Sequence, residues 1–142
     1  MQLLIRRIDQ SLPLPKYATA GSVGLDLLAR EEVKILPGQV NYVPLNVALK
    51  LPPRTWALLA ARSSLHKKGL MLANGIGVGD ADFSGNNDEY QAALFNFSSV
   101  PVTVSRGDRL VQLIVVNSNR VSLKEVAQLT DPERGGFGST GG

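Results

Sequence analysis

The chain has 142 residues and no cysteine, with 44% hydrophobic residues, 19% charged residues and a formal net charge of +3. These values predict one folded domain without disulfides or thiolate chemistry, and they argue against a disordered chain. The basic residues are scattered, which indicates a small preference for anionic ligands and not a nucleic-acid-binding surface. Because His66 is the one histidine, a multi-histidine metal centre is excluded, and a bound metal would be a hard cation such as Mg²⁺ with oxygen ligands.

The sequence also bears on where the protein works. No apolar run approaches the ~20 residues that a membrane-spanning helix needs. The segment Met1–Arg7 has too short an apolar stretch for a signal peptide and lacks a small-residue cleavage site. We therefore expect a cytoplasmic protein that does not bind membranes.

Nearly all of the predicted secondary structure is strand. Short apolar or alternating runs recur along the chain, each bounded by Gly, Pro, Asn, Asp or Ser. The predicted strands are Leu3–Ile5, Val33–Ile35, Val40–Val43, Val47–Leu51, Trp56–Ala60, Tyr90–Phe97, Val100–Val104, Leu110–Val116 and Val121–Leu123. One helical turn is expected around Ser63–Lys67. Many short strands with closely spaced turns are typical of a sandwich, barrel or jelly roll.

The end of the chain differs in composition from the rest. Residues 131–142 are rich in glycine and cannot pack a core, so we expect a β-rich domain over residues 1–130 and a flexible arm over residues 131–142. Composition alone fits both a plain disordered end and an arm that carries the charge of Arg134 and the ring of Phe137 to a ligand.

Four other segments interrupt the strand pattern with glycine or a helix start beside charged or hydroxyl residues: 20–27, 61–65, 74–85 and 106–113. Taken alone, each is more typical of an ordinary turn or helix cap than of a ligand site. The second segment suits a phosphate, because the free N–H groups of a helix start and the guanidinium of Arg62 can bind phosphate oxygens together. The third segment is interpreted as a hairpin that carries the carboxylates Asp80 and Asp82.

Together with the arm, these segments resemble the five ordered motifs of the trimeric dUTPase family, the deoxyuridine 5′-triphosphate nucleotidohydrolases. The motifs are similar to residues 20–29, 61–65, 74–85, 106–113 and 134–141, and the resemblance runs from about Tyr17 to the end of the chain. The run Gly-Phe-Gly-Ser-Thr-Gly in the arm is highly specific. The resemblance implies an all-β, jelly-roll-like subunit, described as a distorted β-barrel or β-clip, in a homotrimer whose active sites are shared between subunits.

The resemblance also implies a reaction, the hydrolysis of dUTP to dUMP and pyrophosphate. Asp80 would be the catalytic base that activates the water attacking the α-phosphorus, and it would contact the sugar 3′-hydroxyl. Asp26 would hold Mg²⁺ through the water shell of the ion. The reaction would limit uracil incorporation into DNA and supply dUMP for dTMP synthesis.

The remaining motif residues would bind the nucleotide. Asn74 and the neighbouring backbone, including Gly77, would recognise uracil. Phe83 stands where the family usually has tyrosine, and its ring would pack beneath the deoxyribose and exclude a 2′-hydroxyl. The other implied substrate-binding residues are Arg62, Ser63, Ser64 and Gln112 at the phosphates, and Arg134, Phe137, Gly138, Ser139 and Thr140 in an arm that closes as a lid. Asp108 and Arg109 are expected to be structural, pairing at the subunit contact.

Three features depart from the family pattern. The residues Asn86–Asp88 stand between Gly85 and Glu89 as an insertion, which predicts a longer polar surface loop that alters the mouth of the site or binds a partner. Arg134 lies three residues before Phe137, where the family usually has five. His66 replaces a small residue and is interpreted as a surface histidine.

Two other functions compete with this interpretation. The dCTP deaminases share the fold and several motifs, but they rely on a glutamate base where this chain has Asp80, and the glycine-rich arm favours a dUTPase. A non-catalytic regulator would use nucleotide binding as a switch, with the loop Asn86–Asp88 for its partner. The presence of the base, the phosphate-binding residues and the arm favours the enzyme.

Overall fold

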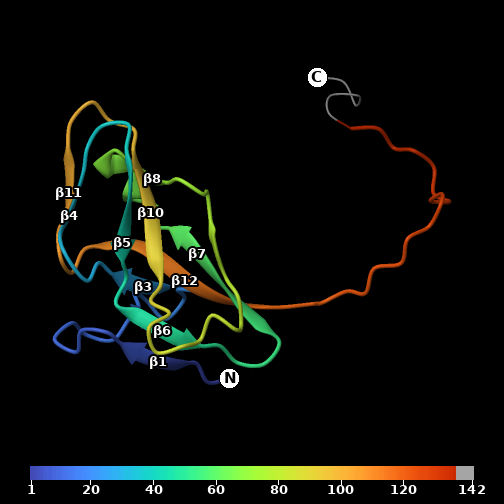
Figure 1. Cartoon of the computed structure of the whole chain (residues 1–142), viewed down its shortest axis with the longest axis horizontal. Helices are drawn as coiled ribbons and strands as arrows, with labels where there is room; N and C mark the ends of the chain where they lie inside the picture. Colours follow the sequence, from blue (N-terminus) through green and yellow to red (C-terminus); the bar gives the residue numbers. More distant parts are fainter. Residues whose placement is uncertain (137–142) are drawn as a thin grey trace.

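The computed structural model describes residues 1–136, and within them the chain is almost entirely β (Figure 1). Its strands are β1 (Leu4–Arg7), β2 (Lys16–Tyr17), β3 (Leu25–Leu28), β4 (Val33–Ile35), β5 (Val40–Pro44), β6 (Val47–Lys50), β7 (Thr55–Ala61), β8 (Leu70–Leu72), β9 (Gly77–Gly79), β10 (Gln91–Asn96), β11 (Val102–Val104) and β12 (Arg109–Asn117). A short 3₁₀ helix, η1, spans Leu65–Lys68. The predicted all-β, jelly-roll-like class is thereby confirmed.

The strands form antiparallel sheets that join distant parts of the chain. The five-stranded sheet has the order β2-β3-β12-β7-β9, and the three-stranded sheet has the order β5-β10-β8. Two further pairs, β1-β6 and β11-β4, complete the body. In the large sheet the late strand β12 lies between β3 and β7, so residues from three separate segments become neighbours there.

The core lies between these sheets and is built by alternation along the strands. In β7 the buried residues Thr55, Ala57 and Leu59 alternate with more exposed ones, as expected for a strand with one face in the core. The apolar residues Leu94 of β10 and Leu113 of β12 are at most 1% exposed. This packing fixes β7, β10 and β12, and these strands carry or adjoin the candidate site. Within residues 1–136 no helix is long and apolar enough to cross a membrane.

Two predictions about local structure are wrong. The segment Val121–Leu123 forms no strand, and the two named side chains are 78% and 93% exposed. Its apolar pattern has no strand beside it to pair with, because β12 ends at Asn117 and the chain beyond Arg120 runs away from the body (Figure 1). The predicted helical turn, in contrast, is present as η1, and it ends at Gly69 with a φ of 75°.

The predicted hairpin over residues 74–85 is also wrong. Strands β8 and β9 do not pair with each other: β8 pairs with β10 and β9 pairs with β7. The turn between them contains Gly75 at a φ of 71°, and the N–H of Gly75 donates to the carbonyl of Leu72. This turn redirects the chain from the three-stranded sheet to the five-stranded sheet. The segment is therefore a corner between two sheets, followed by the loop that carries Asp80 and Phe83.

Candidate active site

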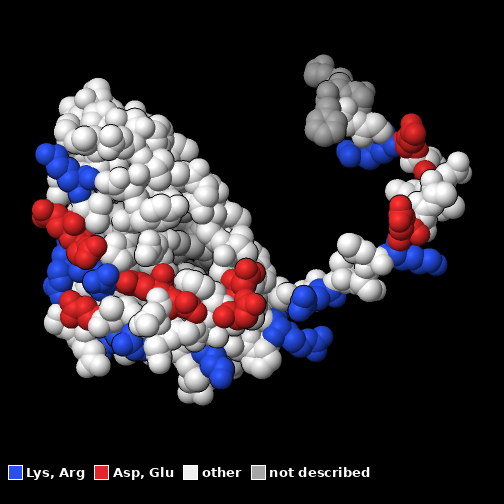
Figure 2. All heavy atoms as spheres, in the orientation of Figure 1, with Lys and Arg blue, Asp and Glu red and all other residues white. Residues whose placement is uncertain are grey.

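A pocket of about 420 Å³ opens beside β9 and the loop that follows it. Its walls are Tyr42, Leu59, Asn74, Gly77, Val78, Gly79, Asp80, Phe83, Glu89, Tyr90 and Gln91. Four of the residues predicted for the site meet here: Asn74, Gly77, Asp80 and Phe83. On the face shown in Figure 2, acidic side chains gather along one side of a hollow. The pocket is thus open to solvent and rich in polar groups.

The backbone of β9 forms one wall of the pocket because two of its residues lack side chains. A Cβ atom on Gly77 would lie 2.9 Å from the Cβ atom of Leu59, and one on Gly79 would collide with the hydroxyl of Tyr90. Glycine at both positions therefore lets β9 approach its neighbours closely. Strand β9 is also the edge of its sheet, so the backbone groups on its outer side are free to bind a ligand.

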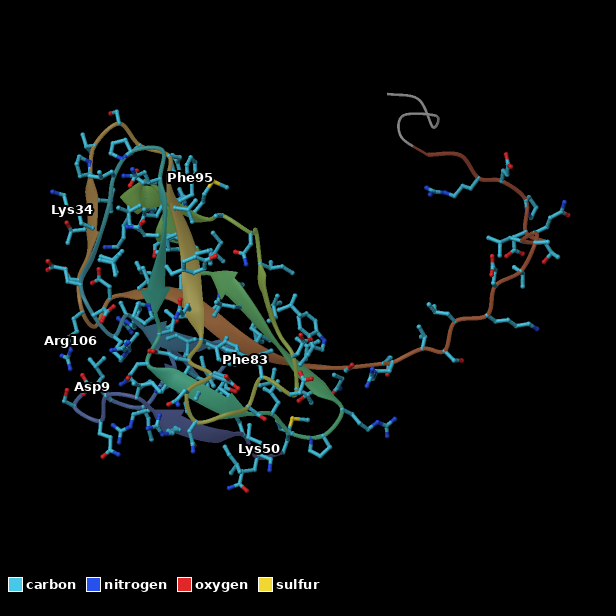
Figure 3. All side chains as sticks on the ribbon, viewed as in Figure 1. Asp9, Lys34, Lys50, Phe83, Phe95 and Arg106 are labelled. Carbon is cyan, nitrogen blue, oxygen red and sulfur yellow. The ribbon has the colours of Figure 1, made fainter. Side chains whose placement is uncertain are left out.

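The loop after β9 sets the positions of the carboxylate and the aromatic ring. The N–H of Phe83 donates to the carbonyl of Asp80 at 3.2 Å, which closes a turn over residues 80–83. The ring of Phe83 is 39% exposed and meets the ring of Tyr90 edge to face, with centroids 5.4 Å apart. Figure 3 shows Phe83 near the middle of the folded body. Within the part of the chain that the structure describes, Asp80 forms no ion pair, so its carboxylate is available to a ligand or water.

A second group of predicted residues lies on the other end of the five-stranded sheet. Gln112 of β12 is paired in register with Asp26 of β3 and with Ala60 of β7. Arg62, just after β7, places Nε 2.9 Å from Oδ1 of Asp26. Arg109 places Nη1 3.7 Å from Oδ2 of the same carboxylate. We call Asp26, Arg62, Arg109 and Gln112 the arginine–aspartate cluster.

Asp26 has the features of a carboxylate that holds a hydrated cation. Asp26 is 7% exposed, and its Oδ2 atom is buried without a hydrogen-bond partner. Across residues 1–136 there is no group of three or more His, Cys, Asp or Glu side chains that could bind a metal directly. A single carboxylate suits Mg²⁺ held through its water shell, since Mg²⁺ keeps several waters when it accompanies phosphates. These residues therefore fit a Mg²⁺ ion that is held through its water shell, and not one that is bound directly by several side chains.

Ser63 and Ser64 occupy the turn between Arg62 and η1. Both are exposed, and the side chain of Ser64 makes no capping hydrogen bond at the start of η1. The turn is held by the N–H of Leu65, which donates to the carbonyl of Arg62, and by the side chain of Leu65, which is 2% exposed. The two hydroxyls are therefore presented to solvent beside the arginine–aspartate cluster on a turn anchored in the core.

The pocket and the arginine–aspartate cluster are far apart within one chain. The register of β9 on β7 pairs Gly79 with Ala57. Asp80, the residue after Gly79, therefore lies opposite Trp56, and Trp56 precedes Arg62 by six residues. At about 3.3 Å per strand residue this separation is about 20 Å. The pocket walls include no member of the cluster. The pocket and the cluster are therefore two separate groups within one chain.

The predicted arm residues are only partly described. Arg134 is exposed, and it is not a wall of the pocket. Phe137, Gly138, Ser139 and Thr140 lie outside the described residues. Their predicted roles remain predictions.

Two of the three departures from the family pattern, the insertion and His66, are surface features. The insertion Asn86–Asp88 forms a compact turn in which the N–H of Gly85 donates to Oδ2 of Asp88 at 2.6 Å. Arg6 ties this turn to β1 by donating to the carbonyl of Asn86 at 2.8 Å. His66 is exposed on η1, as predicted. The insertion contributes no wall of the pocket, although Glu89 directly after it does.

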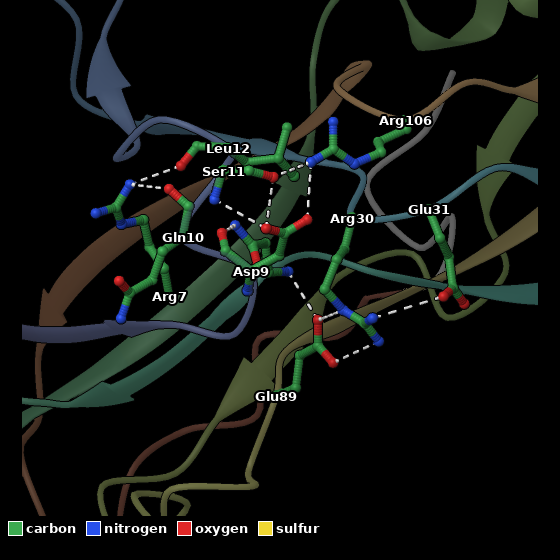
Figure 4. A network of polar contacts seen from close by, with 10 residues as sticks. Arg7, Asp9, Gln10, Ser11, Leu12, Arg30, Glu31, Glu89 and Arg106 are labelled. Carbon is green, nitrogen blue, oxygen red and sulfur yellow. Dashed lines mark hydrogen bonds and ion pairs between the residues drawn. The ribbon is translucent and has the colours of Figure 1, made fainter.

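Glu89 belongs to a polar network that the sequence did not reveal (Figure 4). Arg30 donates to both of its carboxylate oxygens, at 2.8 and 3.1 Å, and the N–H of Asn46 donates to Oε1 at 2.9 Å. The hydrogen bonds from Arg30 to Glu89 raise the pKa of Arg30 above its ordinary value. The network fixes the end of the loop 80–89 against the body, and it occupies both carboxylate oxygens of Glu89.

Asp108 and Arg109 have partners within the same chain. Oδ2 of Asp108 accepts from the N–H of Ser105 at 3.0 Å and lies 3.9 Å from Nζ of Lys68. Arg109 faces Asp26. Their predicted pairing at a subunit contact stays a prediction.

Sequence reasoning also missed Tyr42, Leu59, Tyr90 and Gln91 as pocket walls, because in the sequence they are ordinary strand residues.

The fold and these two groups define an all-β, jelly-roll-like protein with an open pocket beside β9 and a separate arginine–aspartate cluster. The dUTPase family model matches residues 10–141. The chain therefore belongs to the dUTPase family.

Relatives and solved structures of that family cover nearly the whole chain. The deoxyuridine 5′-triphosphate nucleotidohydrolase of Thermobifida fusca is 41% identical over 97% of this chain and 78% of its own length. The enzyme of the same name from Dictyoglomus turgidum is 40% identical over 99% of each chain. The dUTPase of Streptococcus mutans has a TM-score of 0.77 at 32% identity, covering 83% of this chain and 98% of its own. A Staphylococcus bacteriophage 80alpha dUTPase solved with dUpNHpp has a TM-score of 0.86 at 19% identity, over 99% and 98%, and shows the shared fold.

Proposed function

We propose that this protein hydrolyses dUTP to dUMP and pyrophosphate. The observation that carries the proposal is the pocket in which Asn74, Asp80 and Phe83 meet beside the free edge of β9. The relatives named deoxyuridine 5′-triphosphate nucleotidohydrolase support the same substrate. The product would supply dTMP synthesis, and the reaction would keep uracil out of DNA. A cytoplasmic location without nucleic-acid or membrane partners belongs to this proposal.

The base would be recognised at β9 and Asn74. Uracil presents an N–H donor with one carbonyl acceptor on each side of it. The outer edge of β9 offers the complementary alternation of backbone N–H and C=O groups over Gly77–Gly79, and the amide of Asn74 adds a donor and an acceptor. A base with a different pattern would leave buried groups unpaired, which discriminates strongly.

Asp80 would act as the general base. Its carboxylate is exposed at the pocket and carries no ion pair in the described part of the chain, so it can accept a proton from the water that attacks the α-phosphorus. The ring of Phe83, held on the same turn, would lie under the deoxyribose. Because this contact depends on the bulk of the ring, phenylalanine excludes a 2′-hydroxyl as tyrosine does.

The arginine–aspartate cluster, with Ser63 and Ser64, would bind the phosphates. Arg62 offers a planar set of donors that suits phosphate oxygens, and Gln112 adds an amide beside it. Asp26 would hold Mg²⁺ through water at its free Oδ2. When bound, the ion neutralises phosphate oxygens and helps to orient the phosphate under attack. The arm would add Arg134 and the residues Phe137, Gly138, Ser139 and Thr140 as a lid.

A homotrimer with shared sites is part of the proposal, and the separation of the two groups supports sites shared between chains. Since Asp80 and Arg62 are about 20 Å apart in one chain, they can serve one nucleotide only if they come from different chains. An apolar face on the sheet β5-β10-β8 supports such an assembly. Val40, Tyr42 and Met71 are 46%, 67% and 48% exposed, and their cross-strand neighbours on β10 are Phe95 and Ala93 (Figure 3). Exposed apolar faces of this kind mark contact surfaces, and Tyr42 joins this one to the pocket.

A nucleotide panel tests the proposal. Purified protein is incubated with dUTP, UTP, dCTP or dTTP, with Mg²⁺ or with EDTA, and pyrophosphate release is followed. We expect turnover of dUTP alone, stimulated by Mg²⁺ and lost in Asp80→Asn. Asp82→Asn is the matched control, because this carboxylate lies two residues along the same loop and is not a wall of the pocket. A trimeric sample that turns over no nucleotide would overturn the proposal.

A further inference from the structure

The hydroxyl of Tyr90 is a buried donor without a partner. The residue is 6% exposed, and its Oη makes no hydrogen bond within the described part of the chain. Buried phenol groups usually have a hydrogen-bond partner, because an unpaired one costs free energy. The unpaired hydroxyl lies at the wall of the pocket and not in a remote part of the core. It is therefore a candidate for a role in the reaction.

The backbone of Tyr90 is fixed on both sides. Its N–H donates to the carbonyl of Val47, and its carbonyl accepts from the N–H of Leu45, both at 2.9 Å. Its ring packs edge to face with the ring of Phe83, and the two ring planes form an angle of 73°. These contacts hold the ring in one place beneath the loop that follows β9, so the hydroxyl has little freedom to seek a partner elsewhere.

The hydroxyl lies directly against Gly79, the residue before Asp80. A side chain at position 79 would collide with Oη and with the adjacent ring carbons of Tyr90. Glycine at 79 and tyrosine at 90 are thus sterically complementary. The absence of a side chain at position 79 is what lets a phenol reach the backbone from which Asp80 projects.

The charges around the hydroxyl leave one acceptor for it. Burial, and secondarily the charge of Asp80, raise the pKa of Tyr90, so the phenol remains a protonated donor at neutral pH. The acidic walls of the pocket are Asp80 and Glu89. Glu89 is already bound by Arg30 and by the N–H of Asn46, whereas Asp80 has no ion pair among the described residues. Asp80 is therefore the carboxylate that can accept from Tyr90.

We propose that Tyr90 is a positioning residue for Asp80: its hydroxyl donates a hydrogen bond to the Asp80 carboxylate and holds it towards the water that attacks dUTP. The inference rests on the proposed function. In this arrangement Gly79 provides the space, Tyr90 provides the donor, and Asp80 keeps one oxygen for the water. The same hydrogen bond would stabilise the ionised form of Asp80 and keep it a base at lower pH.

Kinetics of Tyr90→Phe test the proposal, with Tyr17→Phe as the same chemical change at an exposed position. We expect Tyr90→Phe to lower kcat by about tenfold with little change in KM, and to move the acid limb of the pH–kcat profile to higher pH. Its melting temperature should not fall, because phenylalanine keeps the ring and its packing against Phe83. A kcat and acid limb equal to those of the wild type would overturn the proposal. So would a lower melting temperature with an unchanged pH profile, which indicates a structural role only.

A second measurement does not depend on turnover. With tyrosines labelled at Cζ with ¹³C, the Tyr90 resonance should move on Asp80→Asn, while that of Tyr17, which is not a wall of the pocket, should stay. An inactive wild type with this shift would refute dUTP hydrolysis and still support the contact between Tyr90 and Asp80. If the Tyr90 resonance does not move on Asp80→Asn, the proposed contact between Tyr90 and Asp80 is overturned, whether or not the protein is active.

Discussion

Nε of Arg62 lies 2.9 Å from Oδ1 of Asp26, so the residue expected to bind phosphate and the residue expected to hold Mg²⁺ neutralise each other in the free chain. Arg109 faces the second oxygen of the same carboxylate. A triphosphate that arrives with Mg²⁺ brings both an anion for the guanidinium groups and a hydrated cation for Asp26. The pair therefore keeps a buried carboxylate and an arginine compensated until the substrate offers each a new partner.

Asp26→Asn tests the metal role. Asparagine keeps the shape of the side chain but loses the charge that attracts a hydrated cation, so we expect the Mg²⁺ concentration for half-maximal dUTP turnover to rise by about tenfold. Titration of Mg²⁺ at saturating dUTP measures this. Glu32→Gln, an equal loss of charge at an exposed position, is the control. An unchanged Mg²⁺ dependence in Asp26→Asn would remove this residue from the metal site.

Gly79→Ala tests the steric pair at the pocket wall. The added methyl group would collide with Tyr90, so we expect a loss of about 1–3 kcal/mol in the free energy of unfolding. Tyr90→Val removes the colliding atoms, and Gly79→Ala should cost less in that background than in the wild type. Urea unfolding of the four proteins of this double-mutant cycle measures the coupling. Additive losses would show that the two positions do not interact.

Phe83→Ala tests the exclusion of ribonucleotides. Removing the ring takes away the bulk against which a 2′-hydroxyl would clash, so the ratio of kcat/KM for UTP to that for dUTP should rise. Phe83→Tyr restores the residue usual in the family and should leave the ratio as it is. Comparison of the two variants with both nucleotides is the measurement. A ratio that stays at the wild-type value in Phe83→Ala would place sugar selection elsewhere in the pocket.

Arg106→Ala tests an ion pair at the edge of the body, where Asp9 and Arg106 meet (Figure 4). Hydrogen bonds from Arg106, and then from Ser11, hold the pKa of Asp9 well below its ordinary value of 3.8. A carboxyl group with a lowered folded-state pKa stabilises the fold above its unfolded pKa, and this contribution is lost as the pH falls through the folded pKa. Arg106→Ala should thus be less stable than the wild type at neutral pH, with a difference that narrows below about pH 4.

Urea unfolding between about pH 3 and pH 7 measures the narrowing. Lys50→Ala, which removes an exposed cation on β6, is the control for net charge. If Arg106→Ala and the wild type differ by the same amount at every pH, the pair does not set the acid stability of this edge.

The long strands were predictable because their sequences alternate. The strands β5, β7 and β12 appear where apolar residues recur between turn residues. The two-residue β2 and the three-residue β8 and β9 are too short to show a period, and the interpretation of residues 74–85 as a hairpin was wrong because the turn at Gly75 connects two sheets.

The candidate site was predictable as a set of residues but not as an arrangement. Asn74, Asp80 and Phe83 stand close in sequence and share a pocket. The contact between Asp26 and Arg62 depends on the placement of β12 between β3 and β7, and no local pattern reports that order. The contact of Tyr90 with Gly79 likewise joins β9 to the residue just before β10. The separation of Asp80 from Arg62 emerges only from the register of β9 on β7.

That separation leads to a test of site sharing by complementation. Asp80→Asn and Arg62→Ala should each be inactive as pure proteins, since each lacks one half of every site. When the two are unfolded together in equal amounts and reassembled, a site is complete if its Asp80 comes from an Arg62→Ala chain and its Arg62 from an Asp80→Asn chain. Random assembly in a trimer that takes these residues from different subunits makes about a quarter of the sites complete, so about a quarter of wild-type activity should return. If both residues of a site came from one chain, no mixed assembly would contain a complete site and no activity would return. Reassembly of each variant with itself is the control, and sedimentation velocity confirms that all samples contain the same oligomer.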